Sequence, residues 1–242
     1  EIAAMRYYYD FHMHSCLSPC GDNDMTPQNI AAMAKLKGLN IIALTDHNSC
    51  LNCVAMEEAA KARGILFVPG MEVCTSEEVH VVCLFPDTSA AMKFGEKIYR
   101  RIPDIRNRPH VFGYQFVMDE NDDICAEETR LLTNALDLTI DRLERAVHSA
   151  GGFCFPAHID RPSFSIISNL GGIPENCSFP AVEVKNTGAY PLLQQQYPQL
   201  ITRGVLINSD AHSLADIAER EHYLEVDNLS CAAEVIDVLK KM

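Results

Sequence analysis

The chain is poor in basic residues: 20 Lys and Arg stand against 33 Asp and Glu among 242 residues, which gives a formal net charge of −13. Such a charge is unfavourable for stable binding to duplex nucleic acid or to anionic lipid. It does not exclude a nucleotide substrate, because bound divalent ions reverse the local field. No apolar run is long enough to span a bilayer, and the N-terminus lacks a basic segment followed by an apolar one. We therefore expect a cytoplasmic protein without a membrane partner.

The chain also lacks a Pro/Gly/Ser-rich linker, a low-complexity stretch and an internal repeat, so we expect a single domain over residues 1–242. Ten cysteines would indicate disulfides in a small secreted protein. In a chain of this size without an export signal they indicate reduced thiols instead. Four of them lie on two neighbouring predicted loops and would form a separate zinc or redox site if they met, although uninvolved thiols are the preferred interpretation: Cys16, Cys20, Cys50 and Cys53.

Short apolar runs alternate with helical patterns along the chain. Seven runs are typical of buried parallel strands, being rich in branched or aromatic residues and flanked by polar ones: residues 7–11, 40–44, 65–68, 79–85, 152–156, 181–184 and 205–207. Helices are predicted after Thr26, which can act as a cap with Pro27 at the first position, over 51–62, and from Thr139 to near Gly151. The alternating order predicts a parallel sheet with right-handed crossovers, and a closed or nearly closed barrel is favoured over an open sheet.

Histidines and carboxylates stand at the ends of these runs. His12 and His14 are two residues apart, so on a regular strand their side chains share one face. The other candidates are His47 after the second strand, Glu72 after the third, His80 at the start of the fourth, His158 after the fifth, and Asp210 and His212 after the seventh. A β/α barrel gathers the far ends of its strands on one face. Imidazole and carboxylate together suit zinc, manganese or iron there, and the cations would compensate the buried carboxylates.

These motifs, in this order and with these gaps, resemble the PHP superfamily, named for polymerase and histidinol phosphatase. The resemblance rests on the segments His12-Met13-His14, Thr45-Asp46-His47-Asn48, Gly70-Met71-Glu72, Ala157-His158 and Ser209-Asp210-Ala211-His212. It runs from Asp10 to His212 and therefore covers nearly the whole chain. It implies a distorted seven-stranded (β/α)7 TIM-like barrel, a metal cluster at the carboxyl ends of the strands, and hydrolysis of phosphate esters.

The resemblance also implies a set of ligands for two to three divalent ions of zinc, manganese or iron. A first ion would take His12, His14, Glu72 and Asp210; a second would share Glu72 and add His80 and His158; a third would take His47 and His212. The family usually supplies an Asp or His shortly after the His-x-His pair, but this chain has Ser18-Pro19-Cys20-Gly21-Asp22 there. Cys20 and Asp22 both fall near that position. Cys20 is preferred by a small margin, because a thiolate suits zinc or iron.

The implied reaction is attack of a metal-bound hydroxide on a phosphomonoester. Arg161 and Lys185 follow strands on the predicted catalytic face, so we expect them to bind the phosphate, although either could form an ordinary ion pair. With the metal-binding Asp210 and His212 they complete the predicted catalytic residues. The expected substrate is a small phosphorylated metabolite, a nucleotide or a short oligonucleotide, and the sequence gives no indication of oligomeric state.

Residues 102–138 separate the fourth and fifth predicted strands and are less regular than the rest. They are an insertion that forms either a lid or specificity element, or a solvated hairpin packed against the barrel. Two other functions remain open. An amidohydrolase would also place His-x-His on its first strand, but it would use a carbamylated lysine or a carboxylate from a middle strand as a bridge. A regulatory domain would keep the metal cluster without catalysis.

Overall fold

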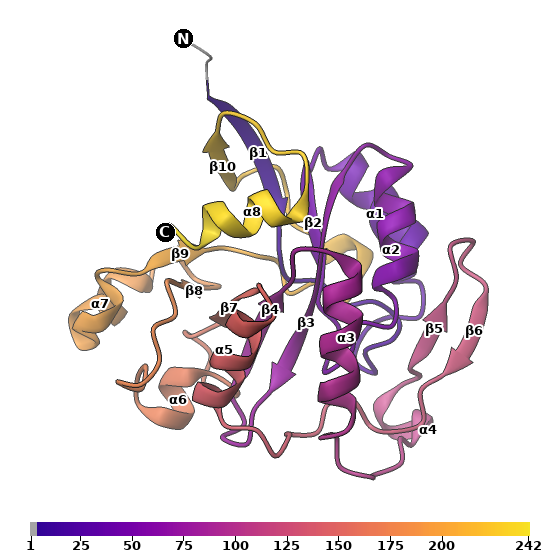
Figure 1. Cartoon of the computed structure of the whole chain (residues 1–242), viewed down its shortest axis with the longest axis horizontal. Coiled ribbons are helices and arrows are strands. Elements are labelled where there is room, and N and C mark those ends of the chain that lie inside the picture. Colours follow the sequence, from indigo (N-terminus) through magenta and orange to yellow (C-terminus); the bar gives the residue numbers. More distant parts are fainter. Residues whose placement is uncertain (1–3) are drawn as a thin grey trace.

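A computed structural model describes residues 4–242 and shows an α/β fold built on a curled sheet (Figure 1). Six strands form one sheet in the order β10-β1-β2-β3-β4-β7, and β8 and β9 form a parallel pair. The strands are β1 (Met5–Asp10), β2 (Ile41–Leu44), β3 (Leu66–Cys74), β4 (His80–Leu84), β7 (Phe153–Pro156), β8 (Ala181–Glu183), β9 (Gly204–Leu206) and β10 (Tyr223–Val226). All seven predicted strands are therefore present, and β10 is an additional strand at one edge.

Helix α1 (Pro27–Leu36) begins where capping chemistry predicts, whereas Thr139 precedes α5 (Ile140–Ser149) without a capping hydrogen bond. Thr26 accepts a hydrogen bond from the Asn29 N–H at 3.4 Å and Pro27 occupies the first turn of α1, while Gly38 follows its end at a φ of +77°. The remaining helices are α2 (Cys53–Lys61), α3 (Thr88–Tyr99), α4 (Pro109–Phe112), α5 (Ile140–Ser149), α6 (Ile166–Leu170), α7 (Tyr190–Gln196) and α8 (Ala232–Leu239), and α1 itself is Pro27–Leu36. The predicted helices over 51–62 and from Thr139 correspond to α2 and α5.

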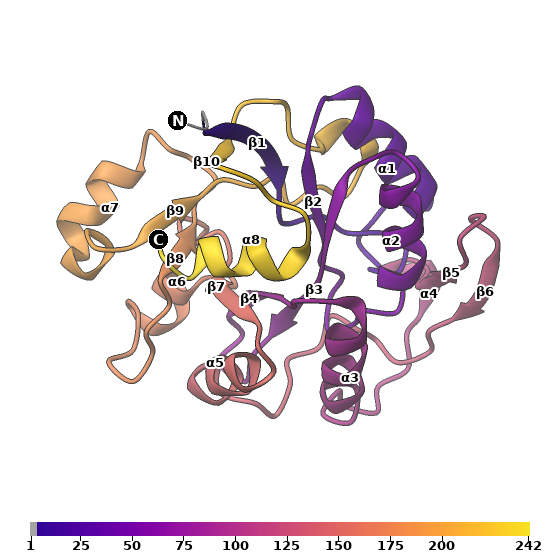
Figure 2. The ribbon, with the colours of Figure 1, turned by 45° about the horizontal axis from the view of Figure 1, so that its top comes forward.

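The sheet separates two apolar cores. Its inner face buries alternate strand residues such as Phe11, Val68 and Phe155 against Val235 and Ile236 of α8. Its outer face packs against α1, α2, α3 and α5. Figure 2 shows the sheet curving around α8, with α1, α2 and α3 on the outside. Because α8 fills one end of the curl, the opposite end is left for the polar residues that follow the strands.

The curl is carried further by contacts beyond the regular strands. The Ile159 N–H donates to the Glu183 carbonyl at 2.9 Å, which joins the end of β7 to β8. On the other side, Met13 and Ala211 form a parallel bridge past the ends of β1 and β9. These contacts place the segments after β1, β7, β8 and β9 around one space. The hydrogen-bonded strand order alone does not establish a seven-stranded barrel.

The expectation of an all-parallel sheet is wrong for β4. This strand pairs antiparallel with both β3 and β7. Only residues 75–79 join β3 to β4, and the Glu78 N–H donates to the Thr75 carbonyl at 2.9 Å within that turn. A parallel crossover needs a dozen or more residues, so a link this short forces a reversal. The edge strand β10 also runs antiparallel to β1.

The insertion over residues 102–138 contains α4 and a hairpin of β5 (Phe116–Met118) and β6 (Ile124–Glu127). It is docked against the loops after β1 and β2: the Phe116 N–H donates to the Cys16 carbonyl and the Met118 N–H to Asn52 Oδ1, both at 2.9 Å. Its role as a lid stays a prediction. Within residues 4–242, no helix is both long and apolar enough to cross a membrane.

Candidate metal centre

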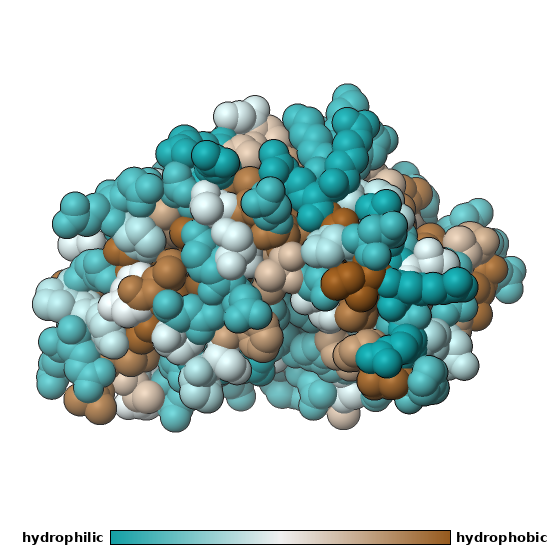
Figure 3. Space-filling view, turned by 90° about the horizontal axis from the view of Figure 1, so that it is seen from below, coloured by the Kyte–Doolittle hydropathy of each residue, from teal (hydrophilic) through white to brown (hydrophobic). Residues whose placement is uncertain are grey.

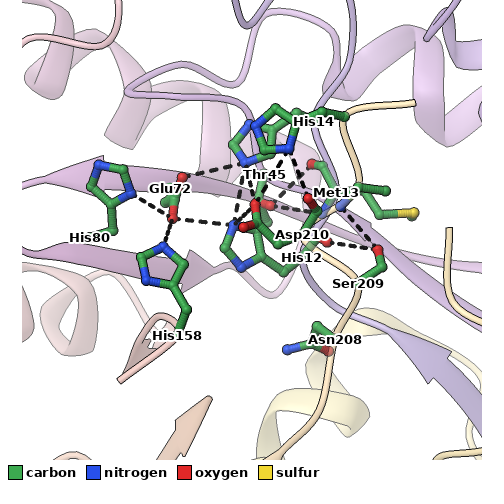
Figure 4. A network of polar contacts seen from close by, with 12 residues as sticks. His12, Met13, His14, Thr45, Glu72, His80, His158, Asn208, Ser209 and Asp210 are labelled. Atoms are coloured by element: carbon green, nitrogen blue, oxygen red, sulfur yellow. Dashed lines mark hydrogen bonds and ion pairs between the residues drawn. The ribbon is translucent and has the colours of Figure 1, made fainter. Parts of the chain in front are cut away.

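The predicted ligands meet at the carboxyl ends of the parallel strands. Figure 4 shows His80 and His158 beside Glu72, with His12, His14 and Asp210 on its other side. His80 reaches this group from the beginning of β4 because that strand runs in the reverse direction. The centre of the group is withdrawn from solvent, since His12 and His14 are fully buried and Glu72 is only 1% exposed, whereas the His212 side chain at its edge is 32% exposed.

Glu72 is the centre of the cluster. Its two carboxylate oxygens lie 3.0–3.4 Å from ring nitrogens of five histidines: His12, His14, His47, His80 and His158. The Asp210 Oδ1 atom lies 3.2 Å from His12 Nε2 and 3.3 Å from His14 Nε2. Despite these short distances, buried Glu72 Oε1 and His47 Nδ1 have no well-directed hydrogen bond. The lone pairs of the carboxylate oxygen and the ring nitrogen therefore point into a shared space without a hydrogen bond between them. Metal ligands are arranged in this way around an ion.

The hydrogen-bond network assigns the tautomer of His12. Both oxygens of Glu183 lie near His12 Nδ1, at 2.9 and 3.1 Å, so this nitrogen carries the proton. The same carboxylate accepts the His158 N–H at 3.0 Å and the Asn208 amide at 2.8 Å. The His12 Nε2 atom is therefore left with a lone pair that points into the cluster. A carboxylate on the outer nitrogen of a histidine is the usual support of a metal ligand.

His14 is oriented in the same way by a serine. Its Nδ1 atom lies 3.0 Å from Ser18 Oγ. Ser18 gives its own proton to Asp46 Oδ1 at 2.7 Å and accepts the His47 N–H at 3.1 Å, so it accepts from His14 as well. In the neutral, metal-binding form of His14 the Nε2 atom therefore carries the lone pair, and it lies 3.3 Å from His12 Nε2. Two lone pairs that face each other at this distance need a cation between or beside them.

The electrostatics agree with this assignment. Burial by itself would lower the pKa of His12, but the carboxylates of Glu183, Asp210 and Glu72 outweigh it and raise the pKa well above its usual value. The same contacts lower the pKa values of Glu72, Glu183 and Asp210, so without an ion the positive charge that these carboxylates favour would be a proton on the imidazole. Burial and the neighbouring His14 lower the pKa of His47 well below its usual value and that of His212 to about 4. Neutral imidazoles are the form that binds metals.

Three groups of donor atoms are close enough for each to hold one ion: His12 with His14 and Asp210, His47 with Glu72 and His80, and His14 with His47 and His212. The His212 Nδ1 atom contacts the carbonyl oxygen of Asp210 at 2.8 Å, which leaves Nε2 free. The chemistry of these donors fits transition-metal ions. His158 adds a further nitrogen 3.4 Å from Glu72.

The two predicted phosphate ligands are placed differently. Arg161 Nη1 forms an ion pair with Asp210 Oδ2 at 2.9 Å, and its side chain is 45% exposed, so a cation stands at the rim of the cluster. The Lys185 ammonium donates to the carbonyls of Asn208 and Ser209 and thereby holds the loop before Asp210. A contact of Lys185 with phosphate stays a prediction.

Cys20 and Asp22 both lie on the surface near the cluster. Desolvation by the surrounding protein and the nearby carboxylates of Glu72 and Asp210 raise the pKa of the Cys20 thiol to about 12. The Asp22 N–H donates to the His212 carbonyl at 2.8 Å, so its backbone also adjoins the site. Neither side chain belongs to the three donor groups.

The two pairs of loop cysteines contact different parts of the chain. Cys50 and Cys53 contact the Gly70 carbonyl through their sulfur atoms, whereas buried Cys16 contacts the Phe116 carbonyl. The four thiols form no metal-binding group within the described part of the chain.

Sequence reasoning missed Glu183, whose contacts are described above, and gave no role to Asp46 or Ser18. Glu183 is the last residue of β8, the strand end at which the other ligands were sought, and it is fully buried. A charged residue inside the apolar run 181–184 was therefore the available signal. Asp46 is joined to the backbone and hydroxyl of Ser15 at 2.7 and 2.6 Å, so it holds the loop after β1 against that after β2.

Comparisons with known proteins agree with the motifs. The sequence model of the PHP domain family matches residues 10–164, which is more than half of the chain. A 5′-3′ exoribonuclease of Haemophilus influenzae is 35% identical over 79 residues, or 31% of this chain and 28% of that protein. An uncharacterised protein of Methanocaldococcus jannaschii is 34% identical over 76 residues, or 28% of this chain and 44% of that protein. The matches thus span less than half of either relative.

Solved structures share the fold at low identity. The lesion-specific endonuclease Q of Pyrococcus furiosus has a TM-score of 0.62 at 21% identity, over 87% of this chain and 49% of that one. A Bifidobacterium adolescentis protein assigned as a metal-dependent phosphoesterase has a TM-score of 0.56 at 20% identity, over 97% and 96%. Endonuclease Q has also been solved with a 27-mer duplex that carries an abasic lesion, at a TM-score of 0.59 and 20% identity over 87% and 50%. This bears against excluding duplex binding on net charge alone.

Proposed function

Because the chain belongs to the PHP domain family, we propose that it is a metal-dependent hydrolase of phosphate esters. The names of its relatives support this, since they include an exoribonuclease, an endonuclease and a phosphoesterase. The observation that carries the proposal is the convergence of imidazole nitrogens on two buried carboxylates, with Arg161 at the rim. The proposed substrate is a phosphomonoester of a small metabolite, a nucleotide or a short oligonucleotide.

We assign two to three ions of zinc, manganese or iron to this centre. The first would use His12, His14, Glu72 and Asp210; the second would share Glu72 and add His80 and His158; the third would use His47 and His212, with Cys20 as an added ligand. When bound, the ions would supply a nucleophile at neutral pH and neutralise phosphoryl charge. In the same proposal, β1 to β4 and β7 to β9 form one distorted seven-stranded barrel.

The protein's own residues would prepare this reaction. Glu183 and Ser18 hold His12 and His14 in the tautomers that direct Nε2 into the cluster. Arg161 is held by Asp210, so its guanidinium is placed to bind phosphoryl oxygens beside the cluster. The burial of the ligands excludes bulk water from the reacting centre and strengthens these electrostatic contacts.

An amidohydrolase is less well supported, although one from Chromobacterium violaceum has a TM-score of 0.60 at 18% identity over 90% of this chain and 92% of that one. An enzyme of that class would use a bridging carbamylated lysine or a carboxylate from a middle strand. Here the central carboxylate is Glu72 on β3, and the ammonium of Lys185 is bound to backbone carbonyls instead.

Metal analysis and turnover test the proposal together. Protein never exposed to a chelator should contain two to three transition-metal ions per chain and should hydrolyse phosphomonoesters with manganese, zinc or iron. His158→Ala should reduce kcat/KM by at least about 100-fold, because removal of even an outer support of a metal centre costs 10- to 100-fold. His148→Ala, on the exposed side of α5, is the matched control. Equal rates for His158→Ala and the parent protein would refute the assignment.

A further inference from the structure

The loop from His158 to Phe164 carries an exposed aromatic side chain at the rim of the metal centre. Phe164 is 42% exposed, although seven of the ten phenylalanines are buried. Its backbone has a φ of +53°, a left-handed conformation that is unusual for a bulky residue. Such strain is found mainly at functional sites, and glycine would relieve it. A phenylalanine in this conformation therefore directs attention to the contacts of its ring.

The ring has a fixed position. Its centroid lies 4.7 Å from that of His80, with an angle of 29° between the planes, so one face covers a predicted metal ligand. The Phe164 carbonyl accepts the His80 N–H at 3.0 Å, which ties the residue to the start of β4. Ser165 caps α6 and donates to the Arg161 carbonyl at 2.8 Å. Both ends of the loop are thus anchored, and the exposed part of the ring is preorganised.

The loop also supplies a cation next to the ring. Arg161, three residues before Phe164, is 45% exposed and paired with Asp210 at 2.9 Å. Within seven residues the loop offers His158 to the metal centre, a guanidinium to a phosphate, and a flat apolar face. Figure 3 shows the molecule from below the view of Figure 1, the side toward which β3 points. On this face the hydrophobic residues occur in separate patches among hydrophilic ones. A single exposed ring beside a phosphate site fits a small planar group better than an extended apolar partner.

We propose that Phe164 is a specificity-determining residue on which the base of a nucleotide stacks while its phosphate lies at the metal centre beside Arg161. The inference rests on the proposed function and names its substrate class. A nucleotide joins an anion to a planar ring through one sugar, and the loop presents the complementary groups in the same order. Stacking is tolerant of base identity, because every base has a π face.

Matched substrates and variants test this role. Adenosine 5′-monophosphate and ribose 5-phosphate share the phosphate and the sugar, and only the former has a base. For the metal-loaded parent protein we expect kcat/KM to be about 5- to 160-fold higher for the nucleotide, the range of one base–aromatic stack. Phe164→Gly should remove this preference through KM, whereas Phe164→Tyr should keep it. Tyr223→Ala, an exposed aromatic residue on β10, is the control. A 5′-phosphorylated dinucleotide distinguishes a free nucleotide from a nucleic-acid end.

Calorimetric binding of the same compounds separates this inference from the phosphoesterase proposal. If the protein hydrolyses neither compound but binds the nucleotide more tightly in a Phe164-dependent manner, the phosphoesterase proposal fails and the stacking role stands. An equal loss for both compounds in Phe164→Gly would show that the ring only supports His80. A parent protein without preference for the nucleotide would equally overturn the inference. Metal content, measured for each variant, should be unchanged.

Discussion

Replacement of Glu183 by glutamine tests the centre at a residue that touches no ion. Glu183 is fully buried, and both of its oxygens must accept. One accepts the His158 N–H at 3.0 Å and the other accepts the Asn208 amide at 2.8 Å. Asn208 cannot turn to relieve a conflict, because its Oδ1 atom accepts the Phe11 N–H at 2.9 Å. A glutamine offers one acceptor and one NH2 group, so one donor would face another donor.

The expected cost follows from these contacts. A support of this kind typically contributes 10- to 100-fold to metal affinity, or about 1.4 to 2.7 kcal/mol. The loss should appear as weaker metal binding in competition with a chromophoric chelator, together with a lower Tm of the loaded protein. Glu175→Gln removes a charge from an exposed position and should change neither quantity. If Glu183→Gln bound metal within twofold of the parent protein, the assigned tautomer of His12 would be incorrect.

Three other predictions follow. Chelation should lower Tm, because Glu72 and Asp210 then lose their counter-charge, and metal at 100 times its Kd should restore about 2.7 kcal/mol; an unchanged Tm would contradict metal binding by the folded state. Phe164→Gly should be more stable than Phe164→Ala by about 1 kcal/mol in urea unfolding, because only alanine keeps a Cβ at the left-handed φ; equal stability would contradict that backbone geometry. Burial raises the pKa of Tyr9 to about 12, so the contribution of its neutral phenol to the free energy of unfolding is complete below about pH 10 and is lost as the pH rises to about 12. Tyr9→Phe in reducing buffer should therefore lose less stability than the parent protein between about pH 10 and about pH 12. An equal loss in both proteins would contradict the raised pKa.

The sequence predicted which segments converge better than it predicted how they run. Apolar runs and polar strand ends were sufficient to locate β1 to β4 and β7 to β9, since burial on both faces leaves a strong pattern. Direction is different, because an apolar run has the same composition whichever way it points. His80 stands at the start of β4 and would lie on the wrong side of an all-parallel sheet. The short link over residues 75–79 was the signal that resolves this.

The supporting residues were harder to predict than the candidate ligands. Histidines in motifs are conspicuous, but Glu183 follows an ordinary Ala-Val pair and acquires its role only through His12, 171 residues away. The same holds for Ser18, which links His14 to Asp46. The spacing of His12 and His14 predicted that their side chains would lie on the same face of a strand. However, β1 ends at Asp10, and the two histidines lie in the segment after it, which is held by the bridge between Met13 and Ala211. Such long-range contacts leave no periodic pattern in the sequence.

Because β4 reverses direction, some residues of the metal centre are close together in the sequence and others are far apart. Glu72 and His80 belong to one hairpin, in which Glu72 pairs with Val82 and Cys74 with His80. Phe11 and Asn208, which hold the distant segments together, are 197 residues apart. The entropy lost in closing a loop grows with its length, so the hairpin carries the smaller penalty during folding. During synthesis, the β3–β4 hairpin could therefore bring Glu72 and His80 together before the segment that carries Asn208 and Asp210 has been made.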